Sequence, residues 1–187
     1  MKSSFKTRFY YDWVLYVAVV VVAVVVWYLA FGLFNAPAPT ETIDVFFAGT
    51  VKDYSIAEQG QKAMETRGVK LVEIISCSPS DEVFSTKYSV VGVNACDVVV
   101  VPVSVADKTD CKNTFLKLEG FSDTYLQEGE AYGVILSETT RSALSAYFDF
   151  GAEDYVVFVV ASSKNAVGDA LAGNATAFLR WLVSYEG

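Results

Sequence analysis

The hydrophobic pattern of this chain changes once, near residue 35. Residues 13–34 carry no charged side chain and are rich in valine. At about 1.5 Å of rise per residue, a helix of this length covers the roughly 30 Å hydrocarbon core of a bilayer. Beyond it, short apolar runs alternate with polar segments, as in a folded domain. The pattern predicts a single N-terminal transmembrane helix followed by one domain.

Charges around the apolar run predict its orientation. Lys2, Lys6 and Arg8 precede it, whereas acidic residues follow it. The positive-inside bias places residues 1–12 in the cytoplasm as a short tail and the rest of the chain outside. A cleaved signal peptide is the alternative, because residues 36–38 (Ala-Pro-Ala) resemble a cleavage site. The run is longer than a signal-peptide core, so we interpret it as an uncleaved signal anchor that makes this a single-pass protein of the cell membrane.

Residues 35–41 read as a short Pro/Ala linker, and residues 42–187 have the periodicity of an α/β domain. Apolar runs rich in β-branched residues predict strands at residues 42–48, 69–76, 97–103, 131–136 and 154–161. Helical spacing predicts helices at residues 55–67, 78–94 and 166–184. The second helix is expected to begin at Ser78, where Ser-Pro-Ser-Asp offers an N-cap, a proline and an acid. Residues 104–130 predict an irregular stretch with one helical turn near residues 114–118.

The order of these elements predicts a doubly wound, mostly parallel α/β domain. The run that follows Asp97 is continuously apolar, which is typical of a central strand buried on both faces of a sheet. No internal repeat is visible.

The amino-acid composition disfavours several classes of partner and of catalytic site. The net charge of −8 disfavours nucleic acid and anionic lipid headgroups as partners. The chain has no histidine, which removes Ser-His and Cys-His catalysis together with the commonest metal ligand. We therefore expect no catalytic residues, no metal site and no cofactor, and a function that is not enzymatic.

Three cysteines, Cys77, Cys96 and Cys111, lie too far apart in sequence for a CxxC zinc or redox pair. Outside the cytoplasm, two of them can form a disulfide, and the pairing cannot be deduced from the sequence. The alternative is that Cys77 and Cys96 are small buried residues at strand ends.

The fold predicts where a ligand would bind, because open α/β sheets use the crevice beyond the carboxyl ends of their parallel strands. The residues that follow the first three predicted strands and could line this crevice are Gly49, Thr50, Lys52, Ser76, Ser78 and Ser104. Hydroxyls, backbone amides and one lysine suit a carboxylate or another small anion. The alternative is that these residues only cap helices and permit turns.

Aromatic residues gather around Gly151, where the chain enters the last predicted strand, at Tyr147, Phe148, Phe150 and Tyr155. They can cap the open end of the sheet or form an interaction patch on the surface.

Five segments, taken in order, resemble a known family. These are residues 84–88 (Phe-Ser-Thr-Lys-Tyr), 95–102 (Ala-Cys-Asp-Val-Val-Val-Val-Pro), 132–136 (Tyr-Gly-Val-Ile-Leu), 155–165 (Tyr-Val-Val-Phe-Val-Val-Ala-Ser-Ser-Lys-Asn) and 177–182 (Ala-Phe-Leu-Arg-Trp-Leu). Together they resemble type 2 extracytoplasmic (periplasmic) solute-binding proteins over residues 42–187.

The resemblance implies one lobe of such a protein rather than two. A full-length member inserts its second lobe where this chain has only residues 137–154. In the full-length family the ligand is held between two lobes that close about a hinge. The tethered single lobe also resembles uncharacterised anchored proteins of Gram-positive bacteria, which supplies an architecture but no activity.

Two functional hypotheses follow. The first is an accessory or interaction subunit of a membrane complex, such as a transporter, with a membrane protein as partner. The second is a tethered module that binds a small solute or peptide and serves an ABC-type permease. Loss of the second lobe favours the first, and the hydroxyl-rich crevice favours the second.

Overall fold

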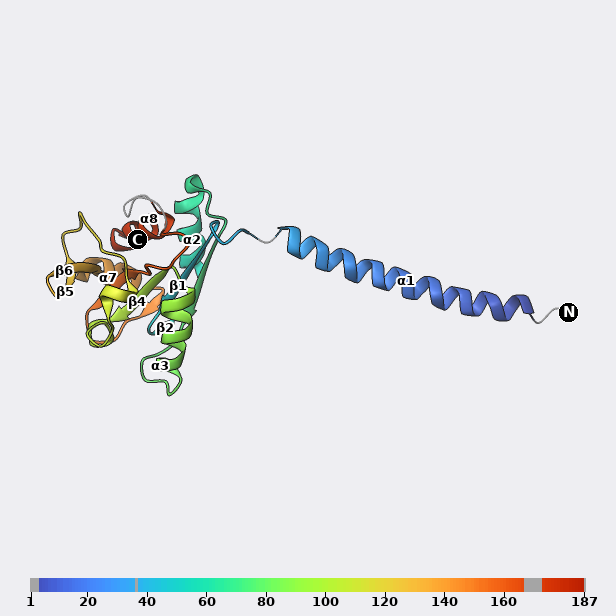
Figure 1. Ribbon diagram of the computed structural model, residues 1–187, viewed down its shortest axis with the longest axis horizontal. Coiled ribbons are helices and arrows are strands. Elements are labelled where there is room, and N and C mark those ends of the chain that lie inside the picture. Colours follow the sequence, from blue (N-terminus) through green and yellow to red (C-terminus); the bar gives the residue numbers. More distant parts are fainter. Residues whose placement is uncertain (1–3, 36, 167–172, 187) are drawn as a thin grey trace. The chain divides into compact units, whose positions relative to one another are not determined.

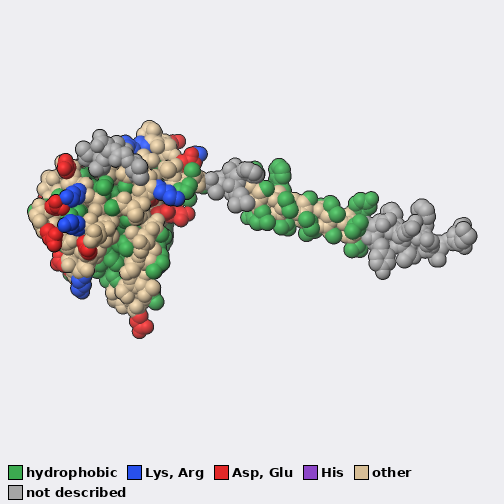
Figure 2. Space-filling model, viewed as in Figure 1, with side chains coloured by type: hydrophobic (Ala, Val, Ile, Leu, Met, Phe, Trp, Pro, Cys, Tyr) green, Lys and Arg blue, Asp and Glu red, His purple; other side chains and the backbone are tan. Residues whose placement is uncertain are grey.

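The computed structural model describes residues 4–35, 37–166 and 173–186. The chain divides into two compact units, Met1–Ala36 and Pro37–Gly187. The first unit is built on the helix α1 (Ser4–Asn35), whose segment Trp13–Phe31 has a mean hydropathy of 2.8 and contains no buried residue. Figure 2 shows the apolar side chains along this segment. Within the described residues, α1 alone is long and apolar enough to cross a membrane. It starts well before residue 13 because no proline or glycine interrupts residues 4–12.

The second unit is an α/β domain around a six-stranded sheet, drawn in Figure 1. The strand order is β3-β1-β4-β8-β6-β5. In chain order the strands are β1 (Thr42–Phe47), β3 (Leu71–Ser76), β4 (Val98–Pro102), β5 (Thr124–Gln127), β6 (Glu130–Ile135) and β8 (Tyr155–Val159). A separate two-stranded pair joins β2 (Thr50–Val51) to β7 (Phe148–Asp149).

The sheet is mixed, so the prediction of a mostly parallel sheet holds only for its β3-β1-β4 half. β1 pairs in parallel with both β3 and β4, whereas β8 is antiparallel to β4 and to β6. A parallel strand needs a crossover that returns the chain to the edge where the previous strand began. The connection from β6 to β8 holds only α7 (Glu138–Leu144) and β7, and it stays at the edge where β6 ends. β8 must therefore run back in the opposite direction.

Helices cover both faces of the sheet, as the doubly wound prediction requires. One face packs against α2 (Ser55–Met64), which continues as a 3₁₀ turn at Glu65–Arg67, and against α8 (Asn174–Val183). The other face packs against a broken helix and two short ones. These are α3 (Phe84–Lys87), a π-helical turn (Tyr88–Gly92), α4 (Val93–Ala95), α5 (Val103–Ala106) and α6 (Cys111–Thr114).

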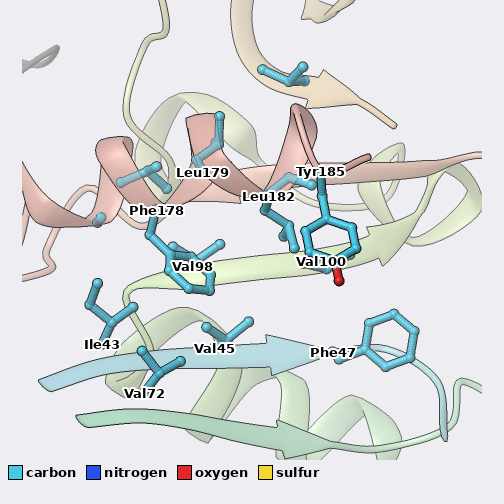
Figure 3. Packing of buried hydrophobic residues seen from close by; sticks show 14 of the residues in the cluster. Ile43, Val45, Phe47, Val72, Val98, Val100, Phe178, Leu179, Leu182 and Tyr185 are labelled. Carbon is cyan, nitrogen blue, oxygen red and sulfur yellow. The ribbon is translucent and has the colours of Figure 1, made fainter. Parts of the chain in front are cut away.

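Alternation along the strands divides the core into two clusters. Val98 and Val100 of β4 contact the α2–α8 side, while Val99 and Val101 contact the other. Figure 3 shows Phe178 and Leu182 of α8 pointing at Val98 and Val100. All five residues of β4 and all five of β8 are buried, which confirms the prediction of strands covered on both faces.

The strand and helix predictions are mostly confirmed, but the helix start at Ser78 is wrong. α3 begins at Phe84, and the Ser78 amide donates to the Asp81 carboxylate in a turn instead. The helical turn expected near residues 114–118 lies at Cys111–Thr114, and α5, α7, β2, β5 and β7 were not predicted. Part of the predicted helix at residues 166–184 lies outside the described residues.

A buried carboxylate, Asp97, joins the amino ends of the central strands to the start of the domain. It is 7 % exposed and precedes β4. One oxygen accepts hydrogen bonds from the Asp44 amide of β1 at 2.9 Å and from Asn165 Nδ2 at 3.0 Å, and the other accepts from the Ser163 hydroxyl. Asn165 Nδ2 also donates to the carbonyls of Pro39 and Thr42, at 3.2 and 2.7 Å. We call these residues the Asp97 network.

Replacing Asp97 by alanine is expected to lower the free energy of unfolding by about 3 kcal/mol or more. The substitution leaves the Asp44 amide and the Ser163 hydroxyl without this acceptor and removes one of the bonds of Asn165. Hydrogen bonds to a charged group are the costly ones to lose. Urea unfolding of the full chain measures the change, with the exposed Asp123→Ala as the control expected to stay within about 0.5 kcal/mol. Equal stability of the two variants would contradict a central role for the network.

Candidate functional site

A cleft of about 370 Å³ opens where the parallel strands β1, β3 and β4 end, at the edge where the sequence placed a binding crevice. Its walls come from the loops after these three strands and from the segment between β7 and β8. The lining residues are Gly49, Thr50, Ser78, Pro79, Ser80, Pro102, Ser104, Asp149, Phe150, Gly151, Ala152, Glu153 and Tyr155. We call it the carboxyl-end cleft.

Four of the six residues predicted for the crevice line this cleft together: Gly49, Thr50, Ser78 and Ser104. Lys52 does not, because its ammonium group pairs with the Asp149 carboxylate at 3.3 Å and donates to the Ser145 carbonyl. Ser76 does not either, and its carbonyl accepts a hydrogen bond from Lys87 Nζ at 2.8 Å.

Gly49 is required by the close approach of two chain segments at the cleft. A Cβ atom at this position would lie 2.5 Å from the Phe47 ring and 3.0 Å from the Asp149 carbonyl oxygen. Directly after it, Thr50 and Val51 pair with Asp149 and Phe148 in the small β2–β7 sheet. This pairing holds the segment ahead of β8 against the loop after β1, so the segment forms the fourth wall of the cleft.

Tyr155 holds the segment between β7 and β8 in place through two hydrogen bonds. Its hydroxyl donates to the Ala48 carbonyl at 3.1 Å and accepts from the Gly151 amide at 3.3 Å. Burial raises the pKa of Tyr155, so the hydroxyl stays protonated at neutral pH. Arg141 of α7 supports the same wall, since it bonds the Glu153 carbonyl at 2.9 Å and the Asp154 carboxylate at 3.2 Å.

The structure argues against the anion site expected here. The Ser78 amide already donates to Asp81, and the Ser104 amide donates to the Glu153 carboxylate at 3.2 Å. The chain's own carboxylates thus occupy donors that an anionic ligand would need. Among the described residues that line the cleft, the charged side chains are Asp149 and Glu153, both acidic. The cleft is therefore suited to cationic or neutral polar groups.

The predicted aromatic cluster lies largely in the core. Phe148 and Tyr155 are 5 % and 3 % exposed, whereas Tyr147 and Phe150 are half-buried. The Phe47 ring packs against Phe148, Phe150 and Tyr155, with centroids 4.5 to 5.8 Å apart. These rings close the carboxyl end of the sheet, which was one of the two alternatives for the cluster. Only the half-buried pair retains exposed ring surface.

The three cysteines are free thiols, and all are buried, so none forms a disulfide. Burial raises the pKa of Cys77, and it raises those of Cys96 and Cys111 to about 12 and about 11. A thiol with such a pKa is almost fully protonated at neutral pH and is a poor nucleophile. They behave as small core residues.

Sequence reasoning missed Asp149 and Glu153, the charged residues of the cleft. They flank Gly151 in a polar segment directly before a buried strand, which is a turn signal. Assigning them to the cleft requires that β8 start at the edge where β4 ends, and this follows only from its antiparallel direction.

Comparisons of the chain with protein-family models, with curated proteins and with solved structures found no match. The resemblance to solute-binding proteins therefore remains a prediction from the sequence.

A second polar hollow, of about 310 Å³, lies at the opposite edge of the sheet, beside the Asp97 network. Asp44 of β1 lines it together with Asp97, Cys96 and Lys164. Burial, followed by the charges of Asp97 and Glu73, raises the pKa of Asp44 to about 6. Ionisation of this side chain therefore costs the folded state free energy.

Replacing Asp44 by asparagine is expected to stabilise the domain at pH 8 and to leave its stability unchanged at pH 4. Because the folded pKa is raised, the contribution of Asp44 to stability is complete below its ordinary pKa near 4 and is lost as the pH rises through about 6. The gain at pH 8 should be about 1–2 kcal/mol, since solvent screens a half-buried charge. Urea unfolding of variant and wild type at both pH values measures it, and a difference that does not change with pH would contradict this role for Asp44.

Proposed function

We propose that this chain is a membrane-tethered, non-enzymatic binding module that holds a small cationic solute in the carboxyl-end cleft, outside the cytoplasm. The observation that carries the proposal is the lining of this cleft by two carboxylates, several hydroxyls and the half-buried Phe150 ring. Carboxylates attract a cation directly, and an aromatic face adds a cation–π contribution.

Of the two acidic groups of the cleft, Asp149 is in an exposed ion pair, and Glu153 is in none with the described residues. Glu153 accepts one amide hydrogen bond from Ser104, which leaves its charge uncompensated by a cation at that contact. Asp149 pairs with Lys52, but the two side chains are 64 % and 47 % exposed, and such a pair is readily screened. Arg141 directs its guanidinium to Asp154 and to a backbone carbonyl. A ligand ammonium group would therefore find acceptors here.

The helix α1 supports the tether. Its apolar segment Trp13–Phe31 is long enough for a bilayer, and the bases ahead of it favour a cytoplasmic N-terminus. In this arrangement the domain collects solute next to the membrane, and a membrane permease is the partner that would take it further.

The accessory-subunit hypothesis rested on the absence of a second lobe, with the aromatic cluster as its candidate contact surface. Phe148 and Tyr155 of that cluster lie in the core. We therefore favour the binding module, whose cleft combines a suitable volume with a defined chemistry.

Putrescine is expected to stabilise the full-length protein in nanodiscs of zwitterionic phosphatidylcholine. Its two ammonium groups suit the two carboxylates of the cleft, and a ligand that binds only the folded state raises the midpoint of thermal unfolding as its concentration increases. Glu153→Gln retains an oxygen for the Ser104 amide but loses the charge, and it should weaken the effect roughly five- to tenfold in apparent affinity.

Two controls make this test decisive. Glu119→Gln removes an exposed carboxylate outside the cleft and should respond to putrescine as the wild type does. The uncharged 1,4-butanediol has the same length and should not shift the midpoint. Equal effects of the diol and the diamine, or an unchanged response of Glu153→Gln, would refute recognition of a cation by the cleft.

The proposed orientation makes a separate prediction. Protease added to intact cells should degrade the domain at residues 42–187, because it lies outside, and the protein should stay in the membrane fraction after a high-salt wash. Immunoblotting with a tag after residue 187 reports both results. Protection of the tag in intact cells, with its loss after lysis, would place the domain in the cytoplasm instead.

A further inference from the structure

A third, larger hollow of about 600 Å³ lies on the face of the sheet covered by α3 and α5. It shares Pro79 and Ser104 with the carboxyl-end cleft, but the rest of its lining differs. Phe84 and Tyr88 form one wall, and Val105 and Lys108 belong to the other. We call it the Phe84–Tyr88 groove.

One wall of this groove is an aromatic platform made of two stacked rings. The rings of Phe84 and Tyr88 are nearly parallel, at 8°, with their centroids 5.8 Å apart. Both rings rest on the fully buried Phe46 ring, at 6.3 and 5.9 Å. Both remain half-exposed and line the groove. The platform therefore presents a rigid apolar surface to the groove, of the kind that stacks on a flat ligand.

The backbone at this wall is irregular in a way that shapes the groove. The helix widens into a π-helical turn at Tyr88–Gly92. Such turns are rare in proteins, and many of those known lie at functional sites. Gly92 lets this turn lie close to Phe46, since a Cβ atom there would be 3.1 Å from the Tyr88 ring and 3.2 Å from the Phe46 ring. The Tyr88 hydroxyl is fixed by Thr109, at 2.9 Å, across the groove's base.

The charge of the groove is opposite to that of the cleft. Lys108 is the charged residue of its lining, and within the described residues it forms no ion pair. The acids next to it in sequence are engaged elsewhere. Asp107 accepts from the Tyr125 hydroxyl at 2.6 Å, and Asp110 accepts from the amide and the side chain of Asn113. An anionic group would therefore meet a free ammonium group beside an apolar wall.

We infer that the Phe84–Tyr88 groove is a second binding site, for a small carboxylate with a flat apolar body. The apolar body stacks on Phe84 and Tyr88, and the carboxylate reaches Lys108. The volume is in the range of small-molecule sites, which combine apolar walls with a few polar groups that fix orientation. This inference does not rest on the cation proposed for the cleft.

The probe for this site is 3-phenylpropionate, titrated calorimetrically into the full chain in phosphatidylcholine nanodiscs, with 3-phenylpropionamide as its uncharged counterpart. We expect saturable binding of the acid and weaker binding of the amide. Lys108→Gln should raise the dissociation constant for the acid roughly five- to tenfold and leave that for the amide unchanged. Phe84→Leu should weaken both probes, because it removes a ring from the platform.

Lys112→Gln is the matched control, since this exposed lysine lies close in sequence but outside the groove lining, and it should bind both probes as the wild type does. Thermal unfolding of every variant verifies that it is folded. No saturable heat with the acid, equal affinity for acid and amide, or an unchanged affinity in Lys108→Gln would each overturn the inference.

Discussion

The domain depends on one buried charge, the Asp97 carboxylate. A buried carboxylate is tolerated only when donors surround it, and here the donors come from β1 and from Ser163 and Asn165 in the segment after β8. Asn165 also donates to the Pro39 carbonyl in the chain ahead of β1. The network therefore fixes the amino ends of neighbouring strands relative to one another. Because strands of a sheet are stiff in register, the positions of their carboxyl ends follow, and the loops of the cleft are presented from a fixed base.

Local patterns predicted much of this fold. β1, β3, β4, β6 and β8 lie where apolar β-branched runs occur, and α2 lies where helical spacing occurs. The direction of β8 was not predictable from its own residues, because it depends on the edge of the sheet at which the connection from β6 ends. The helix start at Ser78 failed for a related reason. The Asp81 carboxylate does accept from the Ser78 amide, but the Ser78 hydroxyl bonds to the Ser80 hydroxyl. The Asp81 amide donates to the Ser78 carbonyl in a turn, and the helix begins later.

The candidate site was predictable in place but not in chemistry. The rule for open α/β sheets located Gly49, Thr50, Ser78 and Ser104 at one cleft. The sequence suggested an anion because amides and a lysine were expected there. In the folded chain two of those amides donate to its own carboxylates, and the lysine pairs with Asp149. Tertiary contacts decide which backbone amides are already hydrogen-bonded within the folded chain. The spacing of residues along the sequence does not reveal these contacts.

The place at which the chain enters the sheet has a mechanical consequence. Residues 37–41 lead directly into β1, which lies inside the sheet and pairs in parallel with β3 on one side and β4 on the other. Tension applied through these residues would load both ladders in shear, so their hydrogen bonds would resist together rather than open one at a time as in a peeled edge strand. The bonds from Asn165 to the carbonyls of Pro39 and Thr42 lie first in line. Residues 37–41 are thereby attached to an interior strand of the sheet rather than to an edge strand.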